Sequence, residues 1–408
     1  MIILVLNSGS SSIKYQVLDM ESKDNHKLLA KGLVERIGLD DGIITHSVPG
    51  ADKYKVNKVI ANHTRGIQAV LDLLTDSTHG VLKSLKDIDA VGHRMVHGGE
   101  IFNKSRLIDS EVIKGVEACN PLAPLHNPAC LLGVKAVTEA LPGVPQVGVF
   151  DTSFHQTIPD YAYMYAIPYH YYKEDKIRKY GFHGTSHRYV SAKGAKFAGL
   201  DYNNSKIITC HLGNGCSITA IKNGKSVDTT MGLTPMGGVM MGTRCGTIDP
   251  SVPIYLMQKY NASVSDMDTM LNKKSGFLGV SGVSPDMRDV ETAAAKGDEH
   301  AVLALKMFRY GIIKYVGAYA AAMQGVDLMI FTGGIGENDP ITREDVSKQF
   351  AFMGVDFDAD ANKNIKRGEP AIISKKNSKV IVAVVPTDEE LMIATDTMEI
   401  VSASKADK

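Results

Sequence analysis

The sequence lacks several features that would assign it to large classes of protein. Its 45 Lys and Arg residues are balanced by 45 Asp and Glu residues, so no overall positive field draws it to nucleic acid or anionic lipid. Its five cysteines are scattered and contain no CxxC pair, which argues against a disulfide framework and against a structural zinc site. We therefore expect small-molecule partners, with no nucleic acid and no membrane.

Long apolar runs are also missing from the sequence. The apolar residues 1–6 have no basic flank and lead directly into Asn7-Ser8-Gly9-Ser10, which fits neither a signal peptide nor a membrane-spanning helix. We therefore expect a cytoplasmic protein. At 408 residues the chain is longer than one hydrophobic core usually grows, so two domains with a cleft between them are the default expectation.

The sequence does contain short β-branched runs that alternate with helical patterns, which predicts an α/β fold. The runs that we interpret as strands are residues 2–6, 90–91, 147–150, 207–209, 328–331 and 380–385. Residues 2–18 and 207–221 share a strand–turn–strand layout, and Asn223-Gly224 offers a two-residue hairpin turn after the second of them. The repeated layout indicates a duplicated core with a boundary near Asp151, although such units also recur by coincidence.

Three glycine-rich turns follow predicted strands. The first, Asn7-Ser8-Gly9-Ser10-Ser11-Ser12, leads to Lys14, so backbone N–H groups, hydroxyl groups and one cation converge there, as phosphate binding requires. The others are His211-Leu212-Gly213-Asn214-Gly215 and Gly333-Gly334-Ile335-Gly336-Glu337-Asn338. Each alone could be an ordinary turn, and none matches GxxxxGK[ST] or GxGxxG. Together they predict a phosphate site.

Two arginines stand close to glycines, Arg94 in Gly92-His93-Arg94-Met95-Val96-His97-Gly98-Gly99 and Arg244 in Gly242-Thr243-Arg244-Cys245-Gly246. A guanidinium group can bind carboxylate or phosphoryl oxygens through two hydrogen bonds. A random arginine more often forms a surface salt bridge, but nearby glycines let the backbone approach a ligand. We expect both arginines to bind anions.

The segment Phe182-His183-Gly184-Thr185-Ser186-His187 has two histidines four residues apart. A zinc-binding helix of the metalloprotease type needs Glu after the first His, and Gly184 stands there, so we reject zinc. We expect His183 to donate a hydrogen bond to phosphoryl oxygens, with a structural histidine as the alternative. Asp151 ends a predicted strand, where ligand sites of α/β proteins lie; its alternative role is a helix cap.

The segment Thr387-Asp388-Glu389-Glu390 is typical of a capping box at the start of a helix. In that interpretation Thr387 is the N-cap and the Glu390 side chain reaches back to it. Glu389 then has no capping role, although an acidic residue in the first turn also suits the helix dipole.

As a set, these segments resemble the acetokinase family of short-chain carboxylate kinases, and the resemblance runs from Asn7 to Glu390. It implies the fold of the sugar kinase, Hsc70 and actin superfamily: α/β, with two duplicated ribonuclease-H-like domains and an interdomain active-site cleft. The N-terminal domain would be residues 1–150, joined by the C-terminal helix 386–408. The nucleotide-binding C-terminal domain would be residues 151–385. Family members are usually homodimers.

The resemblance also implies roles for individual residues. Asn7 and Glu389 match positions associated with Mg²⁺, for which Mn²⁺ is an alternative. The catalytic positions are Arg94, Asp151, His183 and Arg244, and Arg94 also holds acetate. The pocket for the acyl methyl group is matched by Val96, Leu125, Phe182 and Pro235, with His126 close by. The nucleotide positions are Ser10, Ser12, Lys14, His211, Leu212, Gly213, Asn214, Gly215, Asp286, Met287, Arg288, Gly334, Ile335, Gly336, Glu337 and Asn338.

The resemblance is incomplete at three positions. Cys245 and Thr247 stand where we expect Ser and either Asp or Asn, and Thr395 stands where an arginine is frequent. None of these changes removes a catalytic group named above.

The activity implied is the reversible reaction ATP + acetate = ADP + acetyl phosphate. A carboxylic acid is ionised at neutral pH and needs no general base, so the protein has to overcome the repulsion between carboxylate and phosphate. We expect direct in-line transfer, with Asp151 orienting cationic groups or metal-bound water; a phosphoenzyme is the competing mechanism. Alternatives are a propionate kinase, a sugar or polyol kinase that uses Asp151 as a base, and a non-catalytic nucleotide-binding regulator.

Overall fold

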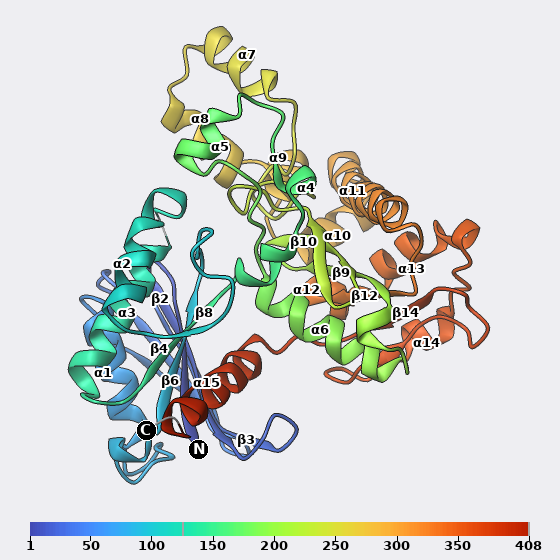
Figure 1. Ribbon diagram of the computed structural model, residues 1–408. Coiled ribbons are helices and arrows are strands. Elements are labelled where there is room, and N and C mark those ends of the chain that lie inside the picture. Colours follow the sequence, from blue (N-terminus) through green and yellow to red (C-terminus); the bar gives the residue numbers. More distant parts are fainter. Residues whose placement is uncertain (125, 407–408) are drawn as a thin grey trace. The chain divides into compact units, whose positions relative to one another are not determined.

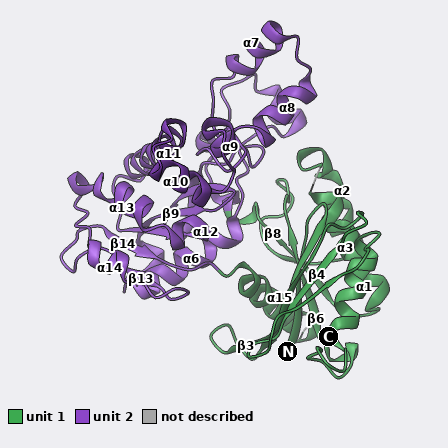
Figure 2. Cartoon of the chain, turned by 180° about the vertical axis from the view of Figure 1, so that it is seen from behind, with its two compact units in different colours: residues 1–154, 388–408 green, residues 155–387 purple. Residues whose placement is uncertain are grey.

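The computed structural model describes residues 1–124 and 126–406, and the chain in it forms two compact units (Figures 1 and 2). Unit 1 contains residues 1–154 and 388–408, and unit 2 contains residues 155–387. Each unit is built around one mixed β-sheet. Among the residues described, every helix is too short or too polar to cross a lipid bilayer.

The sheet of unit 1 has the strand order β5-β4-β3-β2-β1-β6-β8-β7. The strands β1, β2 and β3 pair antiparallel, whereas β6 and β8 continue the sheet parallel to β1. The strands are β1 (Ile2–Ser8), β2 (Ser12–Met20), β3 (His26–Glu35), β4 (Ile43–Ser47), β5 (Tyr54–Asn57), β6 (Ala90–Met95), β7 (Arg106–Leu107) and β8 (Gln146–Phe150).

Helices cover both faces of this sheet (Figure 1). One face packs against α1 (His63–Leu74) and α3 (Asn127–Ala140), and the other against α15 (Glu389–Ala406). A shorter helix, α2 (Ser110–Ala118), packs on α3. Gly92 of β6 allows the approach of α15, because a Cβ atom there would lie 2.5 Å from Thr397 Oγ1 and 2.7 Å from Ile393 Cγ2. This packing brings the C-terminal helix of the chain onto the strands that carry Asn7 and Arg94.

The sheet of unit 2 repeats the five central strands of the unit 1 sheet. Its strand order is β11-β10-β9-β12-β14-β13; β9, β10 and β11 pair antiparallel, and β12 and β14 are parallel to β9. The strands are β9 (Lys206–Leu212), β10 (Cys216–Lys222), β11 (Lys225–Thr229), β12 (Leu328–Thr332), β13 (Ala371–Ile372) and β14 (Ile381–Val384). Three antiparallel strands followed by two parallel strands form the ribonuclease-H-like core in both units, which confirms the predicted duplication.

The helices of unit 2 also lie on both faces of its sheet. The 25-residue helix α11 (Glu299–Met323) packs on β9 and β10, while α6 (Gly184–Phe197) packs on β9 and β12. The remaining helices are α4 (Asp160–Tyr163), α5 (His170–Asp175), α7 (Ser251–Tyr260), α8 (Val264–Lys273), α9 (Gly276–Ser281), α10 (Met287–Ala295), α12 (Gly333–Asn338), α13 (Pro340–Lys348) and α14 (Ala359–Lys363). In Figure 1, α7 and α8 stand out from the sheet of unit 2 as a separate pair of helices.

Local geometry agrees with some predictions and corrects others. Asn223 (φ 54°) and Gly224 (φ 75°) form the predicted two-residue turn between β10 and β11, because both have the positive φ that a type I′ turn requires. The third glycine-rich segment is the short helix α12, in which the Glu337 carboxylate accepts the Gly333 N–H. The strands β3, β4 and β5 were missed, because their apolar residues come in runs of at most three and are interrupted by polar or charged residues.

The predicted capping box at Thr387 is wrong. The helix α15 begins at Glu389, and Asp388 Oδ1 accepts the Leu391 N–H at 2.9 Å, so Asp388 is the capping side chain. The Thr387 hydroxyl instead bonds to Ser186 Oγ at 2.7 Å, and Glu390 pairs with Lys14.

Candidate active site

In unit 1 the predicted functional side chains gather at the carboxyl ends of β6 and β8. Arg94 is on β6, and Asp151 follows β8, where its N–H donates to Met95 O at 2.9 Å. Arg94 donates to both carboxylate oxygens of Asp151, through Nε (3.3 Å) and Nη2, and Nη1 donates to Asn7 Oδ1 at 3.3 Å. The Asp151 side chain is fully buried. The parallel arrangement of β1, β6 and β8 therefore brings three predicted site residues together.

Charges around Arg94 keep its guanidinium group protonated. Burial by itself lowers the pKa of Arg94, but the negative charges of Asp151 and Glu389 outweigh that effect and raise the pKa. Because the guanidinium is largely removed from water, its attraction for a second anion is screened less than at the surface. It can thus bind a carboxylate or phosphoryl group in addition to Asp151.

Helix α15 places Glu389 beside this pair. Glu389 Oε2 lies 3.9 Å from Arg94 Nε, and the mostly buried carboxyl group has its pKa raised to about 7, first by burial and then by the charges of Asp151 and Glu390. Arg94 and Lys14 act in the opposite direction. The carboxyl groups of Asp151, Glu389 and Glu390 thus lie close together. An additional cation would stabilise their negative charges.

The donors at this place suit Mg²⁺ better than a softer metal. Asn7 Oδ1 and the Glu389 carboxylate are hard oxygen ligands, and Mg²⁺ usually takes one or two carboxylates together with water and substrate phosphates. Within residues 1–124 and 126–406 no group of three or more His, Cys, Asp or Glu side chains forms a metal cage. A divalent ion that is bound together with a nucleotide fits these residues.

In unit 2, His183 and Arg244 converge on the turn between β9 and β10. A Cβ atom on Gly215 would lie 3.5 Å from His183 Nε2 and 3.6 Å from Arg244 Nη1, so glycine leaves both donors close to the turn. Arg244 Nη1 also donates to Pro235 O at 2.8 Å, and burial lowers the pKa of Arg244. Two nitrogen donors beside a glycine-rich turn can bind a phosphoryl group.

His183 is held in an uncommon conformation at the start of α6. Its φ of 55° lies in the left-handed region, which few residues other than glycine adopt. Its ring stacks on His211 with centroids 4.3 Å apart, and Nδ1 bonds to Ser217 Oγ at 2.8 Å. The ring is therefore fixed from two sides.

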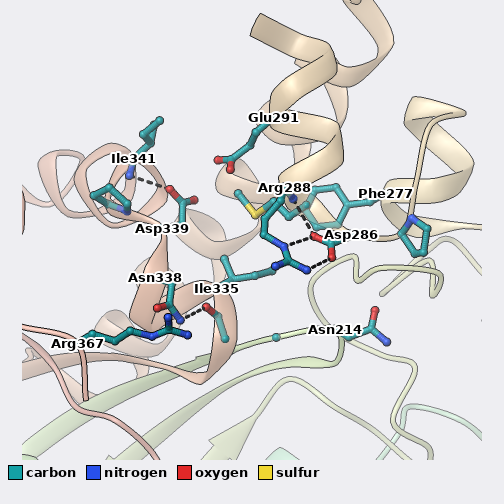
Figure 3. A pocket seen from close by; sticks show the side chains of 15 residues that line it. Asn214, Phe277, Asp286, Arg288, Glu291, Ile335, Asn338, Asp339, Ile341 and Arg367 are labelled. Atoms are coloured by element: carbon teal, nitrogen blue, oxygen red, sulfur yellow. Dashed lines mark hydrogen bonds and ion pairs between the residues drawn. The ribbon is translucent and has the colours of Figure 1, made fainter. Parts of the chain in front are cut away.

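A pocket of about 850 Å³ lies in unit 2 (Figure 3). Eight predicted nucleotide residues line it: Gly213, Asn214, Asp286, Met287, Arg288, Gly334, Ile335 and Asn338. Arg288 forms two hydrogen bonds with Asp286, through Nε at 3.0 Å and Nη2 at 2.5 Å, and this holds the pKa of Asp286 at about 2. Phe277, Met287 and Ile335 give the pocket apolar surface, so it can take a flat heterocycle with a polar substituent.

Other predicted nucleotide residues lie outside this pocket. His211 and Leu212 are buried in β9, Gly215 faces His183 and Arg244, and Gly336 is buried in α12. Glu337 accepts the backbone N–H groups of Gly333 and Thr387, so it organises the chain around α12. In unit 1, Ser10 lies in the turn between β1 and β2, and Ser12 is the first residue of β2. A hydrogen bond from Gly9 N to Ser12 O closes this turn, and Lys14 pairs with Glu390.

The residues predicted for the acyl pocket are divided between the two units. Val96 and His126 belong to unit 1, whereas Phe182 and Pro235 belong to unit 2. Leu125 lies outside the described residues. The pocket for the methyl group stays a prediction.

Sequence reasoning missed several residues that line the 850 Å³ pocket: Phe277, Pro285, Glu291, Asp339, Pro340, Ile341 and Arg367. Asp339 had a readable signal, because Asp before Pro at a helix start is typical of an N-cap, and it accepts the N–H groups of Ile341 and Thr342. No sequence signal marks Arg367, because it follows α14 and is separated along the chain from the other lining residues.

Two of the unusual positions have clear local partners. The Thr247 hydroxyl accepts the Gly238 N–H at 2.9 Å and the Tyr315 hydroxyl at 3.0 Å. Thr395 is buried in α15 and donates to Leu391 O at 2.8 Å. Both threonines therefore serve the fold at these places.

A duplicated ribonuclease-H-like fold, with a nucleotide-sized pocket and with arginine and histidine side chains beside a glycine-rich turn, is typical of a phosphotransferase. Comparison with known proteins is more specific. A model of the acetokinase family matches residues 2–395, and the chain belongs to that family.

Relatives and solved structures agree with this assignment. The chain is 56% identical over 404 residues to an acetate kinase of Caldanaerobacter subterraneus subsp. tengcongensis, covering 99% of this chain and 100% of the relative. It is 56% identical over 400 residues to that of Thermotoga maritima, covering 98% of each. Its fold is similar to the crystal structure of Porphyromonas gingivalis acetate kinase (TM-score 0.94, 52% identity, 98% and 99% covered). A propionate kinase from Francisella tularensis is also similar (TM-score 0.90, 42% identity, 98% and 99% covered).

We predict that Asp151→Asn lowers kcat by about 10²-fold and destabilises the protein by roughly 3 kcal/mol, because a desolvated Arg94 loses its partner. Turnover and urea unfolding of the purified protein check this.

The matched control is Asp228→Asn, which removes a partly exposed pair with Lys179. Its cost should stay below about 1 kcal/mol. If the two variants unfold at the same urea concentration and Asp151→Asn keeps its turnover, the role assigned to the pair is wrong.

Proposed function

We propose that this protein catalyses the reversible, magnesium-dependent transfer of a phosphoryl group from ATP to acetate, giving ADP and acetyl phosphate. The observation that carries the proposal is the identity of 56%, over 99% of the chain, to a protein named as an acetate kinase. Arg94, Asp151, His183 and Arg244 occupy sites in the structure that suit such a reaction.

The chemistry requires charge neutralisation more than proton transfer. Acetate is already ionised at neutral pH, so the transfer brings one anion up to another. Arg94 would hold the acetate carboxylate, while Arg244 and His183 would donate to the transferring phosphoryl group. Mg²⁺, held by Asn7 and Glu389 and by the nucleotide phosphates, would supply further positive charge. Asp151 would orient Arg94 and take no proton.

The 850 Å³ pocket of unit 2 is our proposed site for the adenosine part of the nucleotide. Its volume lies in the usual range for small-molecule sites, and its lining includes Gly213 and Gly334, which have no side chain to block a ligand. The nearby turn at Gly215, with His183 and Arg244, would receive the phosphate chain.

We expect acetate to be the best acceptor in a hydroxamate assay with ATP and Mg²⁺, with propionate slower, butyrate slower still and glycerate inactive. One methylene group in an apolar pocket changes the free energy by about 1–3 kcal/mol, so the step from acetate to propionate is roughly tenfold or more in kcat/KM.

Arg94→Ala is the control, and it should abolish turnover while ATP binding is kept. Faster turnover of propionate would favour the alternative of a propionate kinase, which the 42% identity to such an enzyme supports. If the protein phosphorylates glycerol or a hexose and no carboxylate, it is neither an acetate kinase nor a propionate kinase but a sugar or polyol kinase.

Direct in-line transfer makes a stereochemical prediction. With a γ-phosphoryl group made chiral by oxygen isotopes and sulfur, the acyl phosphate should form with inversion at phosphorus, because one displacement inverts the configuration. Retention would indicate two displacements and a phosphoenzyme on a carboxylate.

We propose that the protein forms a homodimer through α7 and α8. Four large side chains of this helix pair are exposed, with exposed fractions of 57% for Ile254, 59% for Tyr255, 66% for Tyr260 and 75% for Val264. Apolar groups gathered on one part of a surface are typical of interaction sites. A second copy of the chain is the occupant that the resemblance to the family implies.

Sedimentation velocity tests the dimer. The double variant Ile254→Asp and Val264→Asp should sediment as a monomer, since each charge would be buried without a partner. Phe352→Asp, at a residue that is 81% exposed elsewhere in unit 2, should remain a dimer. A monomeric parent protein, or a dimer that survives the double substitution, contradicts this interface.

We also propose a cytoplasmic location, because the proposed reaction needs ATP, which is a cytosolic metabolite. On cell fractionation the activity should follow a soluble cytosolic marker; recovery with membranes would contradict it.

A further inference from the structure

A chain of buried hydrogen bonds connects the sheet of unit 2 to His183. Thr209 Oγ1 bonds to His187 Nδ1 at 2.7 Å, His187 Nε2 bonds to Ser217 Oγ at 2.7 Å, and Ser217 Oγ bonds to His183 Nδ1 at 2.8 Å. Thr209, His187 and Ser217 are all fully buried. Thr209, His187 and Ser217 have no part in the reaction as proposed above.

The strand register explains why these side chains meet. Ser217 on β10 is opposite His211 on β9, and Thr219 is opposite Thr209, so all four side chains share one face of the sheet. Helix α6 packs on β9 and supplies His187, and His183 is the residue before its first turn.

The direction of these hydrogen bonds is restricted by the number of protons. The Ser217 hydroxyl has one proton, so it donates to one histidine and accepts from the other. Among the described residues, the Thr209 hydroxyl bonds only to His187. If Thr209 accepted from His187, its own proton would be buried without an acceptor, which is unfavourable. Thr209 therefore donates to His187 Nδ1.

The direction of the first hydrogen bond also fixes the direction of the bond between His187 and Ser217. Burial, and next the nearby His155 and His211, hold the pKa of His187 well below its usual value, so the ring is neutral and carries one proton. With Nδ1 accepting from Thr209, that proton is on Nε2 and is donated to Ser217. Ser217 must then donate its own proton to His183 Nδ1.

We propose that Thr209, His187 and Ser217 form a directed hydrogen-bond relay that holds His183 as the neutral tautomer with its proton on Nε2. That nitrogen is the one that lies 3.5 Å from the Cβ position of Gly215, beside Arg244. Thr209, His187 and Ser217 are positioning residues that act through His183, because the hydrogen bond made by one ring nitrogen sets the state of the other. The effect of the relay on turnover rests on the proposed function. The tautomer of His183 does not depend on that function.

The tautomer is measured by NMR on the full-length protein labelled with ¹⁵N-histidine, without substrate. Resonances of His183 are identified by their loss in His183→Gln. At neutral pH we expect Nδ1 of His183 to have the chemical shift of an unprotonated nitrogen, and Nε2 that of a protonated one. A proton on Nδ1, or on both nitrogens, would overturn the relay whether or not the protein phosphorylates acetate.

Two isosteric substitutions at neighbouring positions test the origin of the direction. Thr209→Val removes the donor that starts the relay, and Thr219→Val removes a hydroxyl opposite it that bonds to Thr229. We expect Thr209→Val to give a mixture of His183 tautomers, and Thr219→Val to leave the wild-type spectrum. Equal spectra for the two variants would overturn the proposal.

Kinetics adds a readout that separates positioning from general damage. If His183 acts on the phosphoryl group, Thr209→Val should lower kcat about 10-fold to 100-fold, with KM for ATP and acetate within about twofold of wild type. Thr219→Val should keep its kcat. A tautomer change in Thr209→Val with unchanged kcat would support the relay and instead contradict the proposed role of His183 in the transfer.

Discussion

The buried ion pair between Arg94 and Asp151 is the interaction on which the chemistry of unit 1 depends. It joins the ends of β6 and β8, and the same guanidinium contacts Asn7 on β1 and lies 3.9 Å from Glu389 on α15. Burying such a pair costs desolvation energy, so its value lies in position more than in stability. A positive charge already oriented, and already removed from water, needs little rearrangement when an anion arrives.

Much of the fold could be predicted because local sequence and final structure agree. The apolar runs that precede glycine-rich turns became β1, β9 and β12, and Asn223-Gly224 became the hairpin turn between β10 and β11. Prediction failed where contacts between distant parts of the chain determine the local structure. The strands β3 to β5 carry no distinctive pattern, and Thr387 has the sequence of an N-cap but bonds to Ser186 instead.

For the site, the residues that could be predicted are those whose chemistry is rare, such as arginine between glycines or histidine beside a predicted turn. Thr209, Ser217 and Phe277 are common residue types, and only pairing between strands or packing between distant helices brings them to the site. A single sequence contains no sign of that proximity. The pairing of Arg288 with Asp286 is local and could have been expected from their spacing.

The duplicated topology has a consequence for the comparison of the two halves. At equivalent places the two sheets carry unrelated groups: β1 ends at Asn7 and Ser8, whereas β9 ends at His211 and Leu212. The two halves therefore share a backbone plan and differ in the side chains at their strand ends, with an amide and a hydroxyl in unit 1 and an imidazole and an apolar group in unit 2. The likeness of the two halves is thus visible in the pairing of their strands and not in the side chains at the strand ends.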